Sequence, residues 1–209
     1  MKRVLAVVLL LSSLVARAQS TELENPGSVS AIQNRAYTMD FEFDLGVGTL
    51  PLDAFYKGYY PLAGAVVHFN DFLGWQVARG AYSFNVSTGL RDQLERDFAV
   101  APTAFEEVQW FIGSDLLLKP FYGKSSVLNT WVLHYEAHFI LGASLFKFSV
   151  AQFSPALNLG FGIRLFHNRY VSYRLDVSDA IVFGIVGKAK ISQVITIQLM
   201  LALNFGGTE

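Results

Sequence analysis

The stretch YTMDFEFDLGV, residues 37 to 47, decides the fold. Large apolar side chains alternate along it with polar, charged or glycine positions. The apolar set is Tyr37, Met39, Phe41, Phe43, Leu45 and Val47, and the polar set includes Thr38, Asp40, Glu42 and Asp44. A period of two residues predicts a β-strand with one apolar and one polar face. Its length of roughly 36 Å, at about 3.3 Å per residue, suits a tilted transmembrane strand with its rims.

This strand alone is equally compatible with a soluble β-sandwich that buries the aromatic face. The N-terminus shifts the balance toward export. Residues 1–18 resemble a signal peptide, with a basic MKR start, the apolar run VLAVVLLLSSLV and a small-x-small cleavage site at Ala16-Arg17-Ala18. We therefore predict that the signal peptide is removed and that the mature chain starts at Gln19.

The composition narrows the class of protein further. The chain contains no cysteine, so we expect neither a lipid-modified cysteine nor a disulfide framework. Hydrophobic residues make up 52% and charged residues 16%, yet no apolar run reaches the length of a membrane-spanning helix. A membrane-embedded chain of this composition has to cross as strands. The formal net charge of -1 gives no indication of a nucleic-acid partner.

The alternating pattern returns along the chain. Five later stretches show it clearly, at residues 108–119, 129–141, 156–166, 171–177 and 193–205. Two more, at 58–69 and 73–84, alternate poorly, and Arg79 interrupts the face of the second, which predicts a β-bulge or a shifted register. With the first strand, the expected count is eight.

Connection lengths decide between sandwich and barrel. Tight turns are expected at Asn70-Asp71, at residues 120–124 and at residues 167–169, and the links between them are longer, the longest running over residues 85–106. This alternation is typical of outer-membrane barrels with short periplasmic turns and longer external loops, whereas Greek-key sandwiches mix their loop lengths. Trp75 and Trp131 would lie at one rim and Trp110 at the other, as interfacial girdles.

We therefore predict an all-β protein, an eight-stranded antiparallel up-and-down transmembrane β-barrel in the outer membrane of a Gram-negative bacterium. The expected organisation is a periplasmic tail over residues 19–35, the barrel over residues 36–205 and a C-terminal tail over residues 206–209.

Three segments carry a resemblance to a known family. AIQNR at 31–35, GTLPLDAFYKG at 48–58 and HFND...GW at 68–75 resemble the outer-membrane β-barrel domain family of myxobacteria and related delta-proteobacteria. The similarity covers most of the mature chain. It implies a barrel without an assigned chemical activity, and for some barrels of this type a place in gliding-motility envelope complexes. The end of the chain departs from the usual barrel pattern, because Phe205 is followed by Gly-Gly-Thr-Glu and is not the terminal aromatic residue that the insertion machinery reads.

An eight-stranded barrel has an interior just wide enough for side chains. The inward charges are therefore expected to form a network that plugs the lumen, because dehydrated charges have to pair or change protonation. The expected members are Asp40, Glu42, Asp44, Asp115, Lys119, His134, Glu136, His138, Arg164, Arg174 and Asp176. A continuous file of water that conducts protons or ions is the alternative.

The residues give little support to catalysis or metal binding. In the segment from His134 to His138 the two histidines lie roughly 13 Å apart at Cα, so they cannot share one zinc ion without neighbouring strands. Lipid-modifying barrels pair histidine with serine or aspartate near the outer leaflet, and none of the four histidines is followed two residues later by serine. We predict no enzyme, no metal site and no cofactor.

The long loop contains STGLRDQLERDF, residues 87–98. Leu90, Leu94 and Phe98 recur every fourth residue after a Ser87 or Thr88 cap, which predicts a short amphipathic helix that serves as a lid or as a contact surface.

Two functions stay open at this point. One is a non-enzymatic barrel that anchors or scaffolds a cell-envelope or surface complex through its loops and N-terminal tail. The other is a narrow conduit for small hydrophobic molecules or ions. The expected partners are outer-membrane lipid, the barrel insertion machinery during biogenesis and an envelope protein, without nucleic acid.

Overall fold

The computed structural model describes residues 35–51, 56–98, 107–127, 131–149, 153–184 and 192–206. The expected signal peptide and most of the two expected tails lie outside these ranges. The elements are β1 (Phe41–Leu50), β2 (Tyr56–His68), β3 (Leu73–Tyr82), β4 (Phe84–Ser87), α2 (Leu90–Phe98), β5 (Val108–Val127), β6 (Trp131–Phe148), β7 (Ser154–Phe166), β8 (Val171–Val182) and β9 (Ser192–Phe205).

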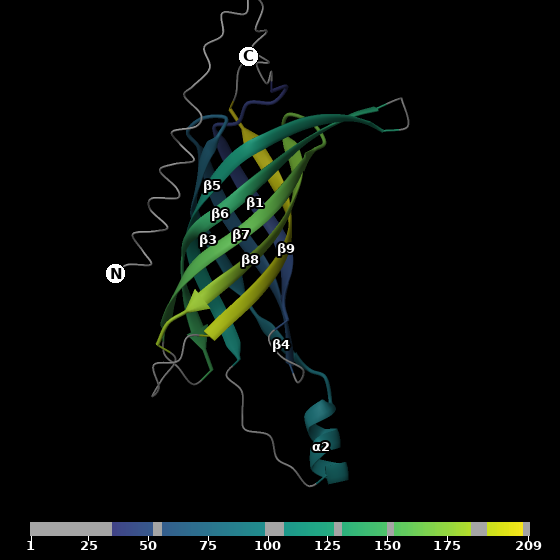
Figure 1. Ribbon diagram of the computed structural model, residues 1–209, viewed down its shortest axis with the longest axis vertical. Coiled ribbons are helices and arrows are strands. Elements are labelled where there is room, and N and C mark those ends of the chain that lie inside the picture. Colours follow the sequence, from purple (N-terminus) through teal and green to yellow (C-terminus); the bar gives the residue numbers. More distant parts are fainter. Residues whose placement is uncertain are drawn as a thin grey trace, which may run out of the picture. The chain divides into compact units, whose positions relative to one another are not determined.

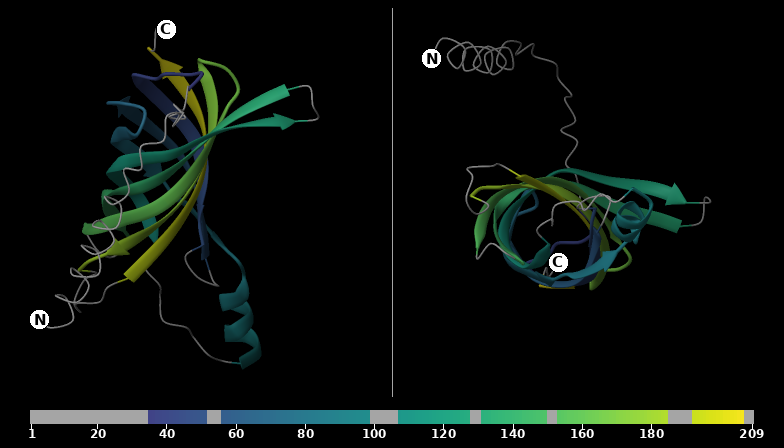
Figure 2. Two further views of the ribbon diagram at one scale, coloured as in Figure 1. Left: turned by 45° about the horizontal axis from the view of Figure 1, so that its top comes forward. Right: turned by 90° about the horizontal axis from the view of Figure 1, so that it is seen from below.

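These strands form one closed antiparallel barrel (Figure 1 and Figure 2). From β5 to β9 each strand pairs with the next, β3 pairs with β2 and β5, and β1 pairs with both β2 and β9, which closes the sheet. β3 and β4 both pair with β2 and are separated only by Ser83, so together they count as one of the eight strands of the barrel. The predicted eight-stranded up-and-down barrel is confirmed.

The exterior of the barrel is apolar. Alternate side chains point outward, and Leu45, Val47, Leu159 and Leu199 are each 50 to 61% exposed. Within the described ranges, no helix has the length and apolar character that crossing a bilayer requires.

Two tight turns have the same chemistry. They connect β2 to β3 and β7 to β8, at the end of the barrel where β1 begins and β9 ends, which we call the proximal end. Asn70 Oδ1 accepts hydrogen bonds from the backbone N–H groups of Phe72 and Leu73, and Asn168 Oδ1 accepts them from Tyr170 and Val171. An asparagine side chain that caps its own turn in this way favours a compact connection.

A β-bulge explains the poor alternation of β3. Its pairing with β5 shifts between Gln76 and Arg79, and its pairing with β2 shifts between Ala65 and Val66. Gln76 and Arg79 are both buried, while the two residues between them are exposed. The bulge brings Arg79 into the interior, and the predicted irregularity at this residue is confirmed.

The predicted turn at residues 120–124 is wrong. β5 continues to Val127 and β6 starts at Trp131, so both strands extend beyond the point where β5 leaves β3 at Leu118 (Figure 1). Pairing shifts between Leu118 and Phe121, and this irregularity accommodates Pro120, which has no N–H to donate to the ladder. The alternation of the residues beyond Pro120 then continues the hairpin past the barrel rim.

The start of the first strand also differs from the prediction. β1 begins at Phe41 and not at Tyr37, and Asp40 is exposed at the rim and does not face the lumen. Tyr37 contacts the rings of His134 and Phe166, which belong to β6 and β7. Before Phe41 the chain therefore leaves the wall, and the pattern of inward and outward side chains changes phase.

Candidate functional site in the barrel interior

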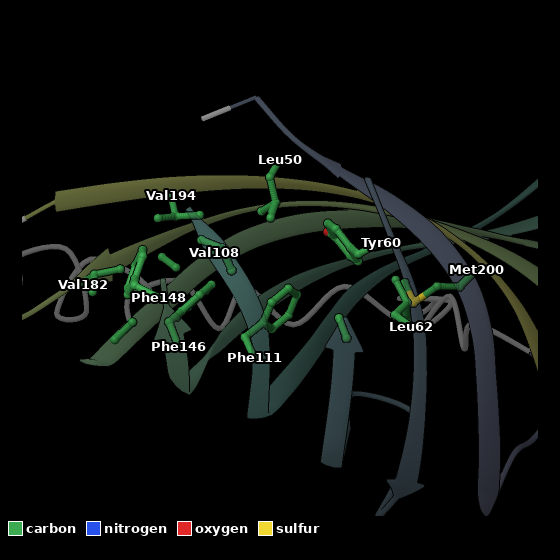
Figure 3. Close-up of a cluster of buried hydrophobic side chains, with 13 residues drawn as sticks. Leu50, Tyr60, Leu62, Val108, Phe111, Phe146, Phe148, Val182, Val194 and Met200 are labelled. Carbon is green, nitrogen blue, oxygen red and sulfur yellow. The ribbon is translucent and has the colours of Figure 1, made fainter. Parts of the chain in front are cut away.

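The interior consists of two layers with different chemistry. The layer at the distal end, opposite the proximal end, is an apolar cluster in which Phe111 stacks on Phe146 with ring centroids 5.0 Å apart (Figure 3). Its members are Leu50, Tyr60, Leu62, Ala81, Val108, Phe111, Phe146, Phe148, Ala156, Ala180, Val182, Val194 and Met200. The proximal layer is mainly charged and also holds a small apolar cluster of Val66, Leu117 and Ile140.

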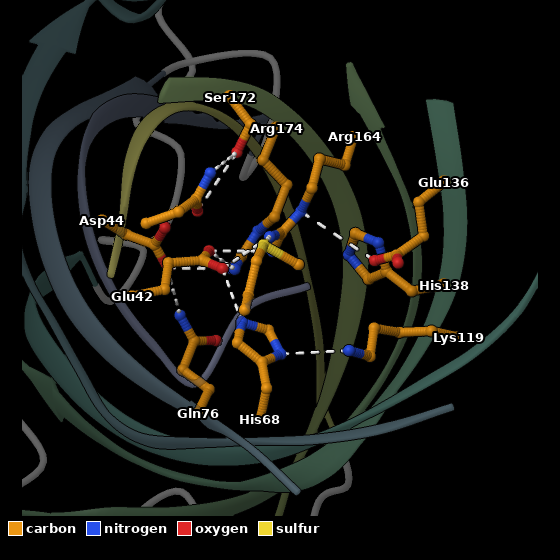
Figure 4. A network of polar contacts seen from close by, with 12 residues as sticks. Glu42, Asp44, His68, Gln76, Lys119, Glu136, His138, Arg164, Ser172 and Arg174 are labelled. Carbon is orange, nitrogen blue, oxygen red and sulfur yellow. Dashed lines mark hydrogen bonds and ion pairs between the residues drawn. The ribbon is translucent and has the colours of Figure 1, made fainter. Parts of the chain in front are cut away.

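Glu42 of β1 is the centre of the charged layer (Figure 4). Its carboxylate accepts two hydrogen bonds from Arg164, Nη1 to Oε2 at 2.6 Å and Nη2 to Oε1 at 2.8 Å. Arg174 Nη1 donates to Oε1 at 3.1 Å, and His68 Nε2 lies 2.8 Å from Oε2. Glu42 and both arginines are 0% exposed, so this is a dry cluster that joins β1 to β7 and β8.

Arg174 carries the network to further carboxylates. Its Nη1 lies 2.9 Å from Asp44 Oδ2, and its Nε donates to Asp176 Oδ2 at 3.0 Å. His138 of β6 pairs with the other oxygen of Asp176 at 3.0 Å. Gly162 provides the space for this contact, since a Cβ there would overlap both Asp176 Oδ1 and His138 Nε2.

A second ion pair involves Arg79. Its Nη2 lies 3.0 Å from Asp115 Oδ2, and its guanidinium is 5.7 Å from the ring centroid of Phe111 in the apolar cluster. Asn158 donates to the other oxygen of Asp115 at 2.7 Å. This pair therefore lies where the charged and apolar layers meet.

The third part of the network is at the proximal mouth. Arg35 binds the carboxylate of Glu136, and its Nη2 donates to the carbonyl oxygen of Lys119 at 3.1 Å. The Lys119 ammonium lies 3.1 Å from His68 Nδ1 and so connects this part to Glu42.

The structure brings together most of the residues expected in the lumen. Nine of them are buried there: Glu42, Asp44, Asp115, Lys119, Glu136, His138, Arg164, Arg174 and Asp176. Asp40 is exposed, and His134 lies half-buried at the mouth between the rings of Tyr37 and Tyr122. In the long loop the predicted helix forms as α2, where Leu90 is exposed and the side chains of Leu94 and Phe98 lie outside the described part.

Sequence reasoning missed His68, Gln76, Arg79 and Arg35 as members of the interior. Their inclusion gives a balance of charge among the described residues. The five buried carboxylates are Glu42, Asp44, Asp115, Glu136 and Asp176, and the five cations facing them are Arg35, Arg79, Lys119, Arg164 and Arg174. Among the described residues, no group of three or more His, Cys, Asp or Glu side chains is arranged to hold a metal ion.

Closed strand pairing and an apolar exterior define the class of protein. A barrel satisfies every backbone group within the sheet, and the exposed apolar belt requires lipid around it. The protein is therefore an integral outer-membrane β-barrel of a Gram-negative bacterium, and outer-membrane lipid surrounds it.

Comparison with known proteins finds no matching family model and no matching curated protein. Among solved structures, the chain is similar to Neisserial surface protein A, with 13% identity, coverage of 79% of this chain and 97% of that chain, and a TM-score of 0.44. It is also similar to a major outer membrane protein from Thermus thermophilus, with 13% identity, coverage of 79% and 99%, and a TM-score of 0.33. The assignment of the fold rests on the strand pairing itself.

Proposed function

We propose that the protein is a non-enzymatic outer-membrane barrel with a closed lumen that anchors or scaffolds a cell-envelope or surface complex. The observation that carries the closed lumen is the fully buried contact of Glu42 with Arg164, which joins strands on different sides of the barrel. With Arg174 and Asp176 it fills the section of the barrel with paired charges.

The apolar layer is a second barrier. Phe111, Phe146 and Phe148 point into the distal half from two neighbouring strands, and each is at most 3% exposed. A hydrated ion that passed the charged layer would have to lose water in this layer, because apolar constrictions exclude water. Two consecutive layers of different chemistry therefore oppose conduction.

The environments of the histidines favour a role without catalysis. His68 and His138 are bound to carboxylates inside the lumen, and His134 packs among aromatic rings. His167 is exposed in the turn between β7 and β8 and packs near Tyr173. Each of the four is thus engaged in a structural contact or placed at the proximal rim.

Two features outside the barrel wall support a scaffolding role. The hairpin of β5 and β6 continues past the proximal rim and exposes Phe121, Trp131 and Val132. At the distal end, α2 interrupts the loop that follows β4. These are candidate contact surfaces on the two sides of the membrane, and the resemblance to the myxobacterial barrel family, proposed on its three segments, suits the same role.

Planar-bilayer recording tests the closed lumen directly. The purified barrel, inserted into a bilayer, should give no steady conductance at moderate voltage of either sign. A commercial porin that conducts in the same bilayer provides the control for the recording. Steady, ion-selective channels from the protein would contradict the proposal and favour a conduit.

A further inference from the structure

The segment from Arg35 to Asp40 reaches across the proximal mouth of the barrel. It precedes β1, yet its contacts are with strands on the opposite wall. Arg35 touches Glu136 of β6, Tyr37 packs on His134 and Phe166, and Arg164 of β7 donates to Met39 Sδ at 2.9 Å. In the closed sheet β6 lies four pairings from β1 in either direction, so the segment spans the opening.

The end of this segment occupies a well-formed site. The guanidinium of Arg35 binds the Glu136 carboxylate and the Lys119 carbonyl oxygen, and lies between two rings, 5.6 Å from the centroid of Phe72 and 5.2 Å from that of Tyr122. The backbone N–H of Ala36 donates to the Tyr122 hydroxyl at 3.0 Å. A carboxylate, a carbonyl oxygen and two aromatic faces are the groups that a planar guanidinium prefers.

Glu136 depends on this contact for its charge partner. Its carboxylate is 0% exposed, and the other arginine near it, Arg164, approaches only to 4.0 Å through Nε. Both Nη groups of Arg164 are bound to Glu42. Loss of Arg35 would therefore remove the cation that binds this buried carboxylate directly and leave it the longer contact with Arg164, which is unfavourable.

We propose that the proximal mouth contains a guanidinium-binding site, occupied by Arg35 of the same chain, and that the segment from Arg35 to Asp40 is a strap that this site holds across the mouth. The inference deepens the proposed closed lumen and rests on it. When Arg35 leaves its site, the strap opens the mouth to water and the deeper layers remain closed. A small alkylguanidinium ion takes the vacated site, because the chemistry of the site recognises the head group and not the rest of the side chain.

Thiol labelling in lipid nanodiscs tests the strap, because the chain contains no cysteine of its own. Ser172→Cys places a thiol at a buried position beside the strap, since Ser172 pairs with Phe166, on which Tyr37 packs. Ser178→Cys places a matched thiol deeper, beyond Arg174 on the same strand. A charged, membrane-impermeant thiosulfonate reports access to each position, and a heat-modifiable gel shift verifies that each variant is folded.

With Arg35 present, both thiols should react slowly. Arg35→Ala should raise the reaction rate of the thiol at position 172 on the order of tenfold or more, because the rate follows the population of the open mouth, and should leave the thiol at position 178 protected. Tyr37→Ala, which loosens the strap but keeps Arg35, should raise the rate by less. Millimolar N-ethylguanidinium should slow the reaction again in Arg35→Ala, whereas ethylammonium at the same concentration should not.

Equal rates at position 172 with and without Arg35 would overturn the strap. Rescue by ethylammonium as well as by ethylguanidinium would overturn the guanidinium site and leave only a requirement for positive charge. Fast labelling of position 178 in the chain with Arg35 intact would contradict the closed lumen itself, and so separates failure of the proposed function from failure of the strap.

Discussion

The two halves of the interior are both buried but differ in their chemistry. In the distal half, apolar side chains such as Phe111 and Phe146 pack against one another. In the proximal half, Glu42, Arg164 and Arg174 form ion pairs and are 0% exposed. Packing tolerates imperfect partners, because a truncated side chain leaves a cavity that can partly collapse. A charge network does not, because a truncated member leaves a stranded charge.

This difference indicates that stability alone does not explain why the proximal half is charged. A buried ion pair can often be replaced by apolar residues of similar volume with no loss of stability. The distal half shows that the same barrel accommodates such residues. In the charged half, the five buried carboxylates are matched by five cations only when Arg35 of the strap is in its site. The charged layer at the mouth therefore includes a cation that comes from the strap and not from the barrel wall.

The largest effect is expected from removal of a central cation. Arg164→Ala leaves Glu42 with fewer partners in a dry site and should destabilise the barrel by about 3 to 5 kcal/mol. The measurement is the urea midpoint in lipid vesicles, with exposed Lys57→Ala as a control that should change stability by less than about 0.5 kcal/mol. Equal midpoints for the two variants would mean that the proximal lumen is wet and screened.

Truncation in the apolar half should cost somewhat less and behave differently. Leu62→Ala removes a buried side chain from the distal cluster, with an expected loss of about 2 to 5 kcal/mol that depends on how far the site collapses. The same urea titration measures it. Because no charge is stranded, adding Glu42→Gln should not recover any of this loss, and recovery would show that the two layers are not separate.

A charge on the outside tests the wall that surrounds both halves. Leu159 faces outward at 50% exposure near the middle of β7, so Leu159→Arg places a cation in lipid at a cost of about 2 to 4 kcal/mol. The fraction of protein that inserts and shows the heat-modifiable shift is the readout, with Leu159→Ile as the matched variant. Insertion of the arginine variant at the level of the isoleucine variant would mean that this face does not contact lipid.

The smallest effect is expected from an added methyl group. A Cβ at position 162 would overlap the contact of His138 with Asp176, so Gly162→Ala should destabilise the charged half by about 1 to 3 kcal/mol. Gly80→Ala is the matched control, because nothing lies within 4 Å of its added Cβ. If thermal unfolding in detergent gives the two variants the same midpoint, the close packing around His138 is not required.

Strict alternation made most of the wall predictable. The residues of β7, β8 and β9 keep one apolar and one polar face, so their facing could be assigned from sequence. In the distal half both faces of the strands are apolar, as in the final part of β6, where Phe146 points inward and Leu145 outward. There the period of two no longer distinguishes inside from outside, and the apolar layer was not predicted.

The missed parts of the site depend on contacts that periodicity does not report. Arg79 faces inward only because of the bulge in β3. The alternation runs without interruption from Tyr37 to Phe43 in the sequence. In the structure, the odd-numbered Tyr37 and Met39 point inward, whereas from β1 onward the even-numbered Glu42 does. The change of phase is set by the strap crossing the mouth, a tertiary contact that a local pattern does not contain.

The central claim is that the proximal half of the lumen is a dry, mutually dependent network. A double-mutant cycle between Glu42→Gln and Arg164→Ala in lipid vesicles tests it most directly, because such a cycle isolates the energy that the two side chains share. The account predicts that the double variant unfolds at a higher urea concentration than Arg164→Ala alone, since the stranded carboxylate has been removed. A double variant whose loss equals the sum of the two single losses would contradict it.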